Sequence, residues 1–275
     1  MLDRFVAAAL PPDPQALQLL FFDPPALDAE AITAFLRPHL PDATCELAPA
    51  PIGVVNADGP PASVVGLVTF GEHVMKLIHF DAPMPYGPVE ACVGPAMIPP
   101  PLKVDSKQHK AHTLLYHTGE TDALEQFVAL CAVAGALARF DAIVVLNEEA
   151  RTAVPAFDLI PDDGEDALNT YRTLPIPYLL GGFLKLDAGD GGPWVRTFAN
   201  HRLNLPNLAR HLTGHEQTGE TFQLFAGMLG YLRTVGETFT AGDTVDLGDG
   251  PKLHLREPRE QEWWLDSSGA MLVVE

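Results

Sequence analysis

The hydrophobic pattern of residues 109–147 predicts a strand, a helix and a second strand, which together form the centre of the fold. Residues 110–117 are a short β-favouring run. Asp122 then has the composition of a helix N-cap. Apolar residues follow it at helical spacings of three and four, namely Leu124, Phe127, Val128, Cys131, Gly135 and Ala138. We therefore expect a helix over 121–139 whose apolar face packs on a sheet, with 141–146 as a buried strand of that sheet.

The pattern on either side predicts further strands around two more helices. Before the central unit we expect a strand at 15–22, a helix at 28–40, loop at 43–61 and a hairpin of 62–70 with 73–80. After it we expect a hairpin of 178–186 with 193–198, a helix at 220–235, and short strands at 244–247, 252–256 and 270–274. Residues 81–108 contain seven prolines and predict a long connection with a short helix near 89–97.

This order of elements predicts an α+β fold with helices packed on mainly antiparallel sheets. The chain divides into two ferredoxin-like pseudo-halves, 15–157 and 175–275, with an acidic junction at 158–174. A chain of 275 residues is long enough for one large domain or two small ones. We expect residues 1–275 to form a single globular unit.

Composition limits the classes of partner. With 47% hydrophobic and 19% charged residues, the chain is an ordinary globular one. Its net charge of −19 argues against nucleic acid and anionic membrane surfaces, which require clustered Lys and Arg. The acidity has two interpretations, solubility or attraction to a basic protein partner.

Cysteine usage and the N-terminus predict a cytoplasmic protein. Cys45, Cys92 and Cys131 are widely spaced, which argues against a disulfide framework or a structural zinc site. The first apolar run stops at Pro11 and is too short for a signal sequence. No segment reaches the roughly 18 apolar residues of a membrane span.

Motifs that identify a reaction are absent from the sequence. It has no phosphate-binding loop, no G-x-G-x-x-G, no H-E-x-x-H and no G-x-S-x-G. Cys131 lies on the predicted apolar helix face, where a thiol is usually a core residue. We therefore predict no catalytic residue, no cofactor and no bound metal.

Histidines are the residues most suggestive of chemistry, since ten are present and imidazole is a common ligand and acid–base group. On an extended strand His112 faces away from His109 and His117, because the spacings of three and five are odd. His79 and Asp81 share a face, and a neighbouring strand could bring His112 to them. A ligand site of His79, Asp81 and His112 is one interpretation, and hydrogen-bonded strand histidines are the other.

Trp263 and Trp264 stand beside Glu260 and Glu262, a combination that suits an aromatic anchor for a partner. The alternative is that they pack, half-buried, beneath the C-terminal strands.

Several phrases, taken in order, resemble a bacterial family known as domain of unknown function 4261. They include FFDPPALDAEAITAFLRPHL, HVMKLIHFDAPMPYG, HKAHTLLYHTG, LPIPYLLGGFLKL and MLGYLRTVGETF followed by AGDTVDL. The resemblance covers nearly the whole chain and supports the predicted architecture. It implies no activity for any residue, because the family has no established one.

These observations leave two functional hypotheses. The first is a non-enzymatic module that binds a basic protein partner, as a masking or adaptor protein, with Trp263 or Trp264 as anchor. The alternative is an enzyme or small-ligand protein with a pocket on the sheet face near His79, Asp81 and His112. The oligomeric state stays open.

Overall fold

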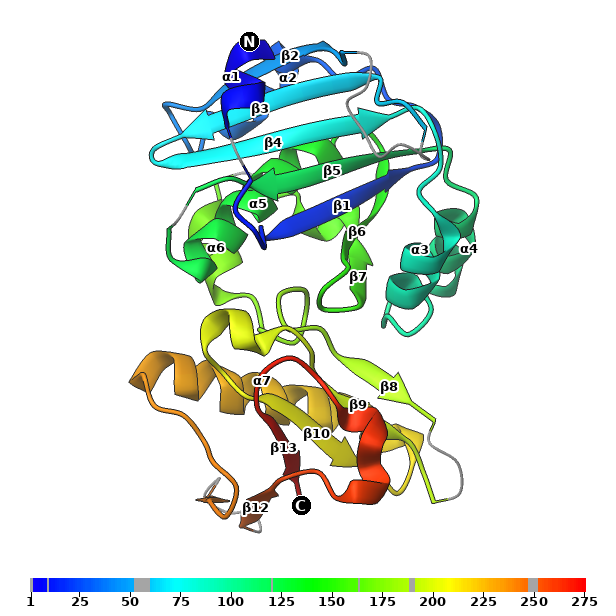
Figure 1. The fold of residues 1–275 in the computed structure, drawn as a ribbon, viewed down its shortest axis with the longest axis vertical. Helices are drawn as coiled ribbons and strands as arrows, with labels where there is room; N and C mark the ends of the chain where they lie inside the picture. Colours follow the sequence, from blue (N-terminus) through cyan, green and yellow to red (C-terminus); the bar gives the residue numbers. More distant parts are fainter. Residues whose placement is uncertain are drawn as a thin grey trace. The chain divides into compact units, whose positions relative to one another are not determined.

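The computed structural model describes residues 2–8, 10–51, 60–119, 121–162, 164–187, 191–246 and 252–275. They form an α+β fold with predominantly antiparallel sheets, as predicted (Figure 1). The chain divides into two compact units, each with its own sheet and its own long helix. The first unit comprises residues 1–148 and 153–174, and the second comprises 149–152 and 175–275.

The first unit is built on a seven-stranded sheet of order β2-β3-β4-β5-β1-β6-β7. Its strands are β1 (Ala16–Phe21), β2 (Thr44–Pro49), β3 (Val64–Phe70), β4 (His73–Phe80), β5 (Ala111–His117), β6 (Ala142–Asn147) and β7 (Thr152–Pro155). Because β5 and β6 flank β1 and both run antiparallel to it, β5, the following helix and β6 form a split βαβ unit. The sheet also carries β2, β3 and β7, so a ferredoxin-like description of this half stays a prediction.

Helices cover both faces of this sheet. They are α1 (Leu2–Ala7), α2 (Ala29–Leu36), α3 (Tyr86–Val93), α4 (Pro100–Lys107), α5 (Ala123–Ala138), the 3-10 helix η1 (Ala156–Leu159) and α6 (Ala167–Thr173). On one face α3 and neighbouring residues bury Leu20, Val144 and Leu146. At the other end of the sheet Phe5 of α1 packs on Val65 and Leu67.

Helix α5 begins where the sequence predicts. The Asp122 side chain accepts hydrogen bonds from the backbone N–H groups of Leu124 and Glu125 at 2.9 and 3.3 Å. The prediction of a single apolar face was too narrow, because every residue from Phe127 to Ala138 is buried. Helices α2, α6 and η1 also pack on α5, and η1 approaches so closely that a Cβ on Gly135 would lie 2.1 Å from the Leu159 carbonyl oxygen.

Three segments contain more regular structure than the sequence predicts. The predicted loop at 43–61 includes β2, an edge strand whose partly exposed residues lack an apolar pattern and which is held by pairing with β3. The proline-rich connection forms two helices, because Pro100 and Pro101 occupy the first turn of α4, where a missing N–H costs nothing. The acidic segment 158–174 folds onto the first unit and carries α6, which Asp166 caps.

The second unit has a six-stranded sheet of order β11-β12-β13-β10-β9-β8. Its strands are β8 (Leu184–Leu186), β9 (Trp194–Arg196), β10 (Asn207–His211), β11 (Thr244–Val245), β12 (Leu253–Arg256) and β13 (Met271–Val274). Only the β10–β13 pair is parallel among the pairings of the described residues. Helix α7 (Thr218–Val235) buries Phe225, Met228, Leu229 and Leu232 in this unit's core.

Short 3-10 helices complete the second unit, namely η2 (Asn200–Leu203), η3 (His215–Gln217) and η4 (Glu260–Leu265). The predicted hairpin exists as β8 and β9, although its first strand is shorter than expected and its turn residues 188–190 lie outside the described residues. Gly182 explains the shortening, since its φ of +58° breaks an extended strand and a Cβ there would meet the Ala150 carbonyl oxygen at 2.0 Å. Across the described parts of both units, no helix combines the length and apolar composition needed to cross a membrane.

Candidate functional site

The structure places the side chains of His79 and Asp81 side by side. The other contact of His79 holds neighbouring strands of the sheet together. His79 Nε2 lies 3.3 Å from Asp81 Oδ1, outside hydrogen-bonding geometry, and His79 Nδ1 lies 2.8 Å from Thr113 Oγ1. The order of carboxylate, imidazole and hydroxyl is that of a nucleophilic triad. Thr113 is completely buried, however, so its hydroxyl cannot reach a substrate. Burial lowers the pKa of His79, so that it hydrogen-bonds Thr113 as a neutral imidazole.

His112 does not join that pair. The register of β4 and β5 places His79 opposite Thr113 and Phe80 opposite His112, so the His112 side chain points to the other face of the sheet. There its ring stacks on Phe80 at 4.5 Å between centroids, and its Nδ1–H donates to the Ala82 carbonyl at 2.8 Å. The three residues of the predicted ligand site therefore do not line one surface.

A second histidine pair connects the ends of the same two strands. His73 opens β4 and His117 closes β5, and His73 Nδ1 lies 3.0 Å from His117 Nε2. His117 Nδ1 lies 3.1 Å from the Gly119 N–H nitrogen and 3.2 Å from the Gly119 carbonyl oxygen. In either neutral tautomer of the pair, His117 Nδ1 therefore has a hydrogen-bond partner in the Gly119 backbone. His117 is fully buried, whereas His73 is partly exposed.

His73 lines a cleft of about 250 Å³ in the first unit, which we name the histidine cleft. Its walls come from the segment after α2, the β3–β4 turn, α5 and α6. The apolar lining residues are Leu40, Phe70, Val128, Ala129 and Leu168, and the others are Asp42, Gly71, Glu72, His73, Glu125 and Arg172. The cleft thus combines an apolar wall with titratable groups.

The electrostatics of the histidine cleft are negative. Arg172 donates two hydrogen bonds to Glu125, each of 2.7 Å, and this pairing lowers the pKa of Glu125. Asp42 and Glu72 form no ion pair with a described residue. Burial lowers the pKa of His73, against the opposing effect of Glu125 and Glu72. At neutral pH the lining therefore holds three carboxylates, one guanidinium and a neutral imidazole.

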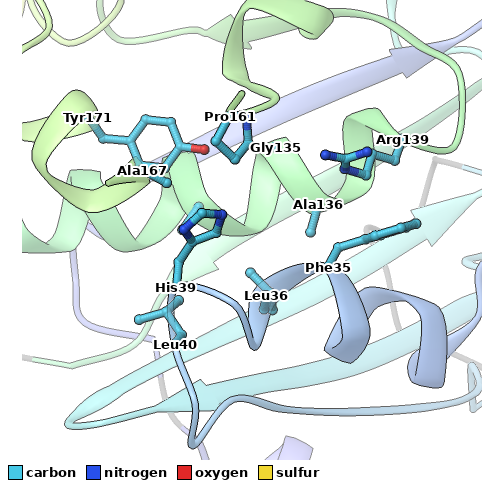
Figure 2. A pocket seen from close by; sticks show the side chains of 11 residues that line it. Phe35, Leu36, His39, Leu40, Gly135, Ala136, Arg139, Pro161, Ala167 and Tyr171 are labelled. Carbon is cyan, nitrogen blue, oxygen red and sulfur yellow. The ribbon is translucent and has the colours of Figure 1, made fainter. Parts of the chain in front are cut away.

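A second cavity, between α2, α5 and α6, is a packing gap. Figure 2 shows the His39 ring beside Tyr171 and Ala167, with Phe35 and Arg139 at the other end. Its volume is about 10 Å³, no more than a single water requires. It has no room for a ligand, and neither this gap nor the histidine cleft is lined by the predicted His79, Asp81 or His112.

In the second unit the two adjacent tryptophans differ sharply. Trp263 is 77% exposed, whereas Trp264 is partly buried with its Nε1 inaccessible to solvent. The Trp263 ring lies 6.0 Å from that of Trp264, which lies 6.3 Å from that of Trp194, both edge to face. Trp263 is thus the outermost of three tryptophans that follow one another, edge to face, outward from β9.

Sequence reasoning missed the His73–His117 pair. The sequence did offer one signal, the predicted hairpin of 62–70 with 73–80, which places His73 at the start of a strand. The pairing of His73 with His117 depends in addition on the register of β4 against β5, which the hairpin does not determine. Among the described residues, no group of three or more His, Cys, Asp or Glu is arranged to hold a metal ion.

No protein-family model, no curated protein and no solved structure matches this chain. The resemblance to domain of unknown function 4261 therefore stays a prediction.

Proposed function

We propose that this protein binds a basic protein partner, as a masking or adaptor module, with Trp263 as the anchor. The observation that carries the proposal is an indole 77% exposed on a rigid support. Tryptophan is the residue most enriched among the side chains that dominate protein interfaces.

Helix η4, which carries Trp263, is fixed on the second unit by charged hydrogen bonds. Arg256 donates two bonds of 2.7 Å to Glu262, and Glu262 also accepts the Arg259 N–H at 2.7 Å. Arg196 donates to the Trp264 carbonyl at 2.8 Å. Because the η4 segment is already held in place, binding requires little additional ordering of its backbone.

The charges around this anchor favour a cationic partner. Glu257 and Glu260 precede Trp263 and form no ion pair with a described residue. An Arg or Lys placed over the indole face would gain a cation–π contact, and the net charge of −19 would speed its approach.

The test compares Trp263→Ala with Tyr231→Ala, since Tyr231 is also exposed, at 55%, but lies on α7. Affinity capture from the native host with the unmodified chain supplies the partner, whose binding is then measured with purified proteins. We expect Trp263→Ala to weaken binding by about thirtyfold or more, as for a centrally buried anchor, and Tyr231→Ala to have little effect. Equal affinities for the two variants would contradict the proposal.

Measuring the binding rates at several salt concentrations separates long-range electrostatic attraction from direct contacts in the complex. We expect the association rate to fall markedly as salt approaches about 0.5 M, with a smaller change in dissociation rate. An association rate independent of salt would remove the electrostatic part of the proposal.

The enzymatic alternative has less support, because His112 lies on the opposite face from His79 and Asp81. Turnover of a small molecule that disappears in His79→Ala or His112→Ala would restore it.

A further inference from the structure

We infer that the histidine cleft of the first unit is a binding site for a small organic cation, a primary ammonium group attached to a compact apolar body. This inference is independent of the partner proposed above, because Trp263 belongs to the second unit.

The size and walls of the cleft define the apolar body. A volume of about 250 Å³ is many times the roughly 10–15 Å³ that a single water requires, so the cleft has room for a small organic molecule. Phe70, Val128 and Leu168 provide an apolar wall from three different elements. An apolar group placed there would displace water without burying a polar group.

The charges of the cleft select the sign of the ligand. The Arg172 fork is occupied by Glu125 through two bonds of 2.7 Å, so it is not available for bidentate binding of an anion. Glu72, beside His73 in the turn, has no described ion-pair partner. A positive group would therefore be attracted and a carboxylate repelled.

His73 provides a hydrogen-bond acceptor for the ammonium. Its Nδ1 is engaged by His117, and its Nε2 has no partner among the described residues. When His73 Nδ1–H donates to His117 Nε2, and His117 Nδ1–H donates to the Gly119 carbonyl, His73 Nε2 presents a lone pair. An ammonium group is a donor only, so it matches this tautomer.

The same imidazole makes the site sensitive to pH. The charged and titratable groups near His73 are Glu72 in its own turn, Glu125 from α5, Arg172 from α6 and His117 from β5. A proton on His73 would remove the acceptor and place a second cation near Arg172. Binding of an ammonium ligand should therefore weaken as the pH is lowered from about 7.5 to about 5.

The experiment uses three matched probes with the full chain, namely benzylamine, the neutral benzyl alcohol and the anionic benzoate. Backbone amide NMR titrations give both the affinity and the location. We expect benzylamine to shift the amides of Gly71, His73 and Glu125 and to bind about fivefold or more tightly than benzyl alcohol, as one partly exposed charge contact provides. Benzoate should bind more weakly than either.

Variants then assign the effect to named side chains. Glu72→Gln should weaken benzylamine by about fivefold, whereas Glu30→Gln, an exposed charge at the start of α2, should leave it unchanged. Leu168→Trp should block the cleft without altering its charge. His73→Gln should abolish the dependence of binding on pH between about 5 and 7.5.

Benzyl alcohol binding as tightly as benzylamine would show a merely apolar pocket and overturn the inference. Tighter binding of benzoate, amide shifts confined to residues outside the cleft, or equal losses in Glu72→Gln and Glu30→Gln would also overturn it. None of these results would bear on Trp263 and the protein partner.

Discussion

The two units differ in the basic side chains that they bury most completely. The sheet of the first unit encloses imidazoles, with His79, His109, His112 and His117 all nearly inaccessible to solvent. The second unit instead encloses a guanidinium, Arg196, which is 1% exposed. The difference lies in whether the buried group can lose its charge.

The histidines of the first unit are buried without charge. A neutral imidazole has one donor and one acceptor, and His109 uses both, donating from Nδ1 to the Ser106 carbonyl and accepting the Met84 N–H at Nε2. Burial lowers the pKa of His112 and of His117 to about 4 in each case. The cost of burial therefore arises only in acid, when an imidazole has to accept a proton.

Arg196 stays charged. Burial lowers its pKa only to about 10, so its positive charge persists at neutral pH. It stacks on Phe198 at 3.8 Å and donates to the carbonyls of Trp264 and Asp266 at 2.8 and 3.2 Å, and its Nη2 has no partner among the described residues. Arg196 thus helps to hold η4 against β9 in the second unit.

The largest expected effect is acid unfolding of the first unit. Because the folded pKa of His112 and His117 is below the unfolded value of 6.5, the unfolded chain binds more protons in acid. Each histidine's contribution to stability is present above pH 6.5 and is lost as the pH falls towards 4, by about 3 kcal/mol per residue. Urea unfolding followed by circular dichroism at several pH values measures this loss.

All three tryptophans belong to the second unit, so their fluorescence provides the matched control. We expect the circular dichroism transition to move in acid before the fluorescence transition does. Coincident transitions at every pH would contradict the contrast between the units.

The next effect concerns the buried guanidinium. Arg196→Met keeps much of the side-chain volume but leaves the Trp264 and Asp266 carbonyls without their donor, and we expect a loss of about 3 kcal/mol. Arg233→Met, on the surface of α7, is the control and should stay within about 0.5 kcal/mol. Tryptophan fluorescence during urea unfolding gives both values, and an equal response of the two variants would show that Arg196 is dispensable.

A smaller change should reverse sign with pH. His112→Phe keeps a ring against Phe80 but loses the hydrogen bond to Ala82, which costs about 1 kcal/mol at pH 7.5. Near pH 4.5 the variant should be more stable than the unmodified chain, because it no longer has a buried group to protonate. Unfolding curves at both pH values, with the exposed His254→Phe as control, test for this crossing.

The sequence predicts the features that depend on interactions between residues close together in the chain. The Asp122 cap and the apolar spacing after it located α5. The alternation of side chains along a strand correctly placed His112 and His117 on opposite faces of the sheet. Which histidines meet depends on the register of β4 with β5, strands separated by two helices, and that register placed His112 opposite Phe80. Composition alone contains no information about such pairing.

The same limit applies at β2 and at the two tryptophans. Edge strand β2 is held by backbone pairing with β3, so its side chains need no regular pattern. Trp263 and Trp264 are adjacent residues of the same type, yet Trp263 is exposed and Trp264 is partly buried. Only the tertiary fold, which fixes η4 through Arg196 and Arg256, distinguishes them.

The smallest expected effect on stability is at the proposed anchor. Trp263 is 77% exposed and contacts the edge of Trp264, so Trp263→Ala should change the unfolding free energy of the second unit by no more than about 0.5 kcal/mol. Trp264→Ala should cost about 3 kcal/mol, because that ring also packs on Trp194 and the covered cluster around Leu265. Urea unfolding followed by circular dichroism avoids the change in fluorescence that each substitution causes. A large loss in Trp263→Ala would mean that its indole supports the fold and is not held outward for a partner, which would also remove the basis of the proposed function.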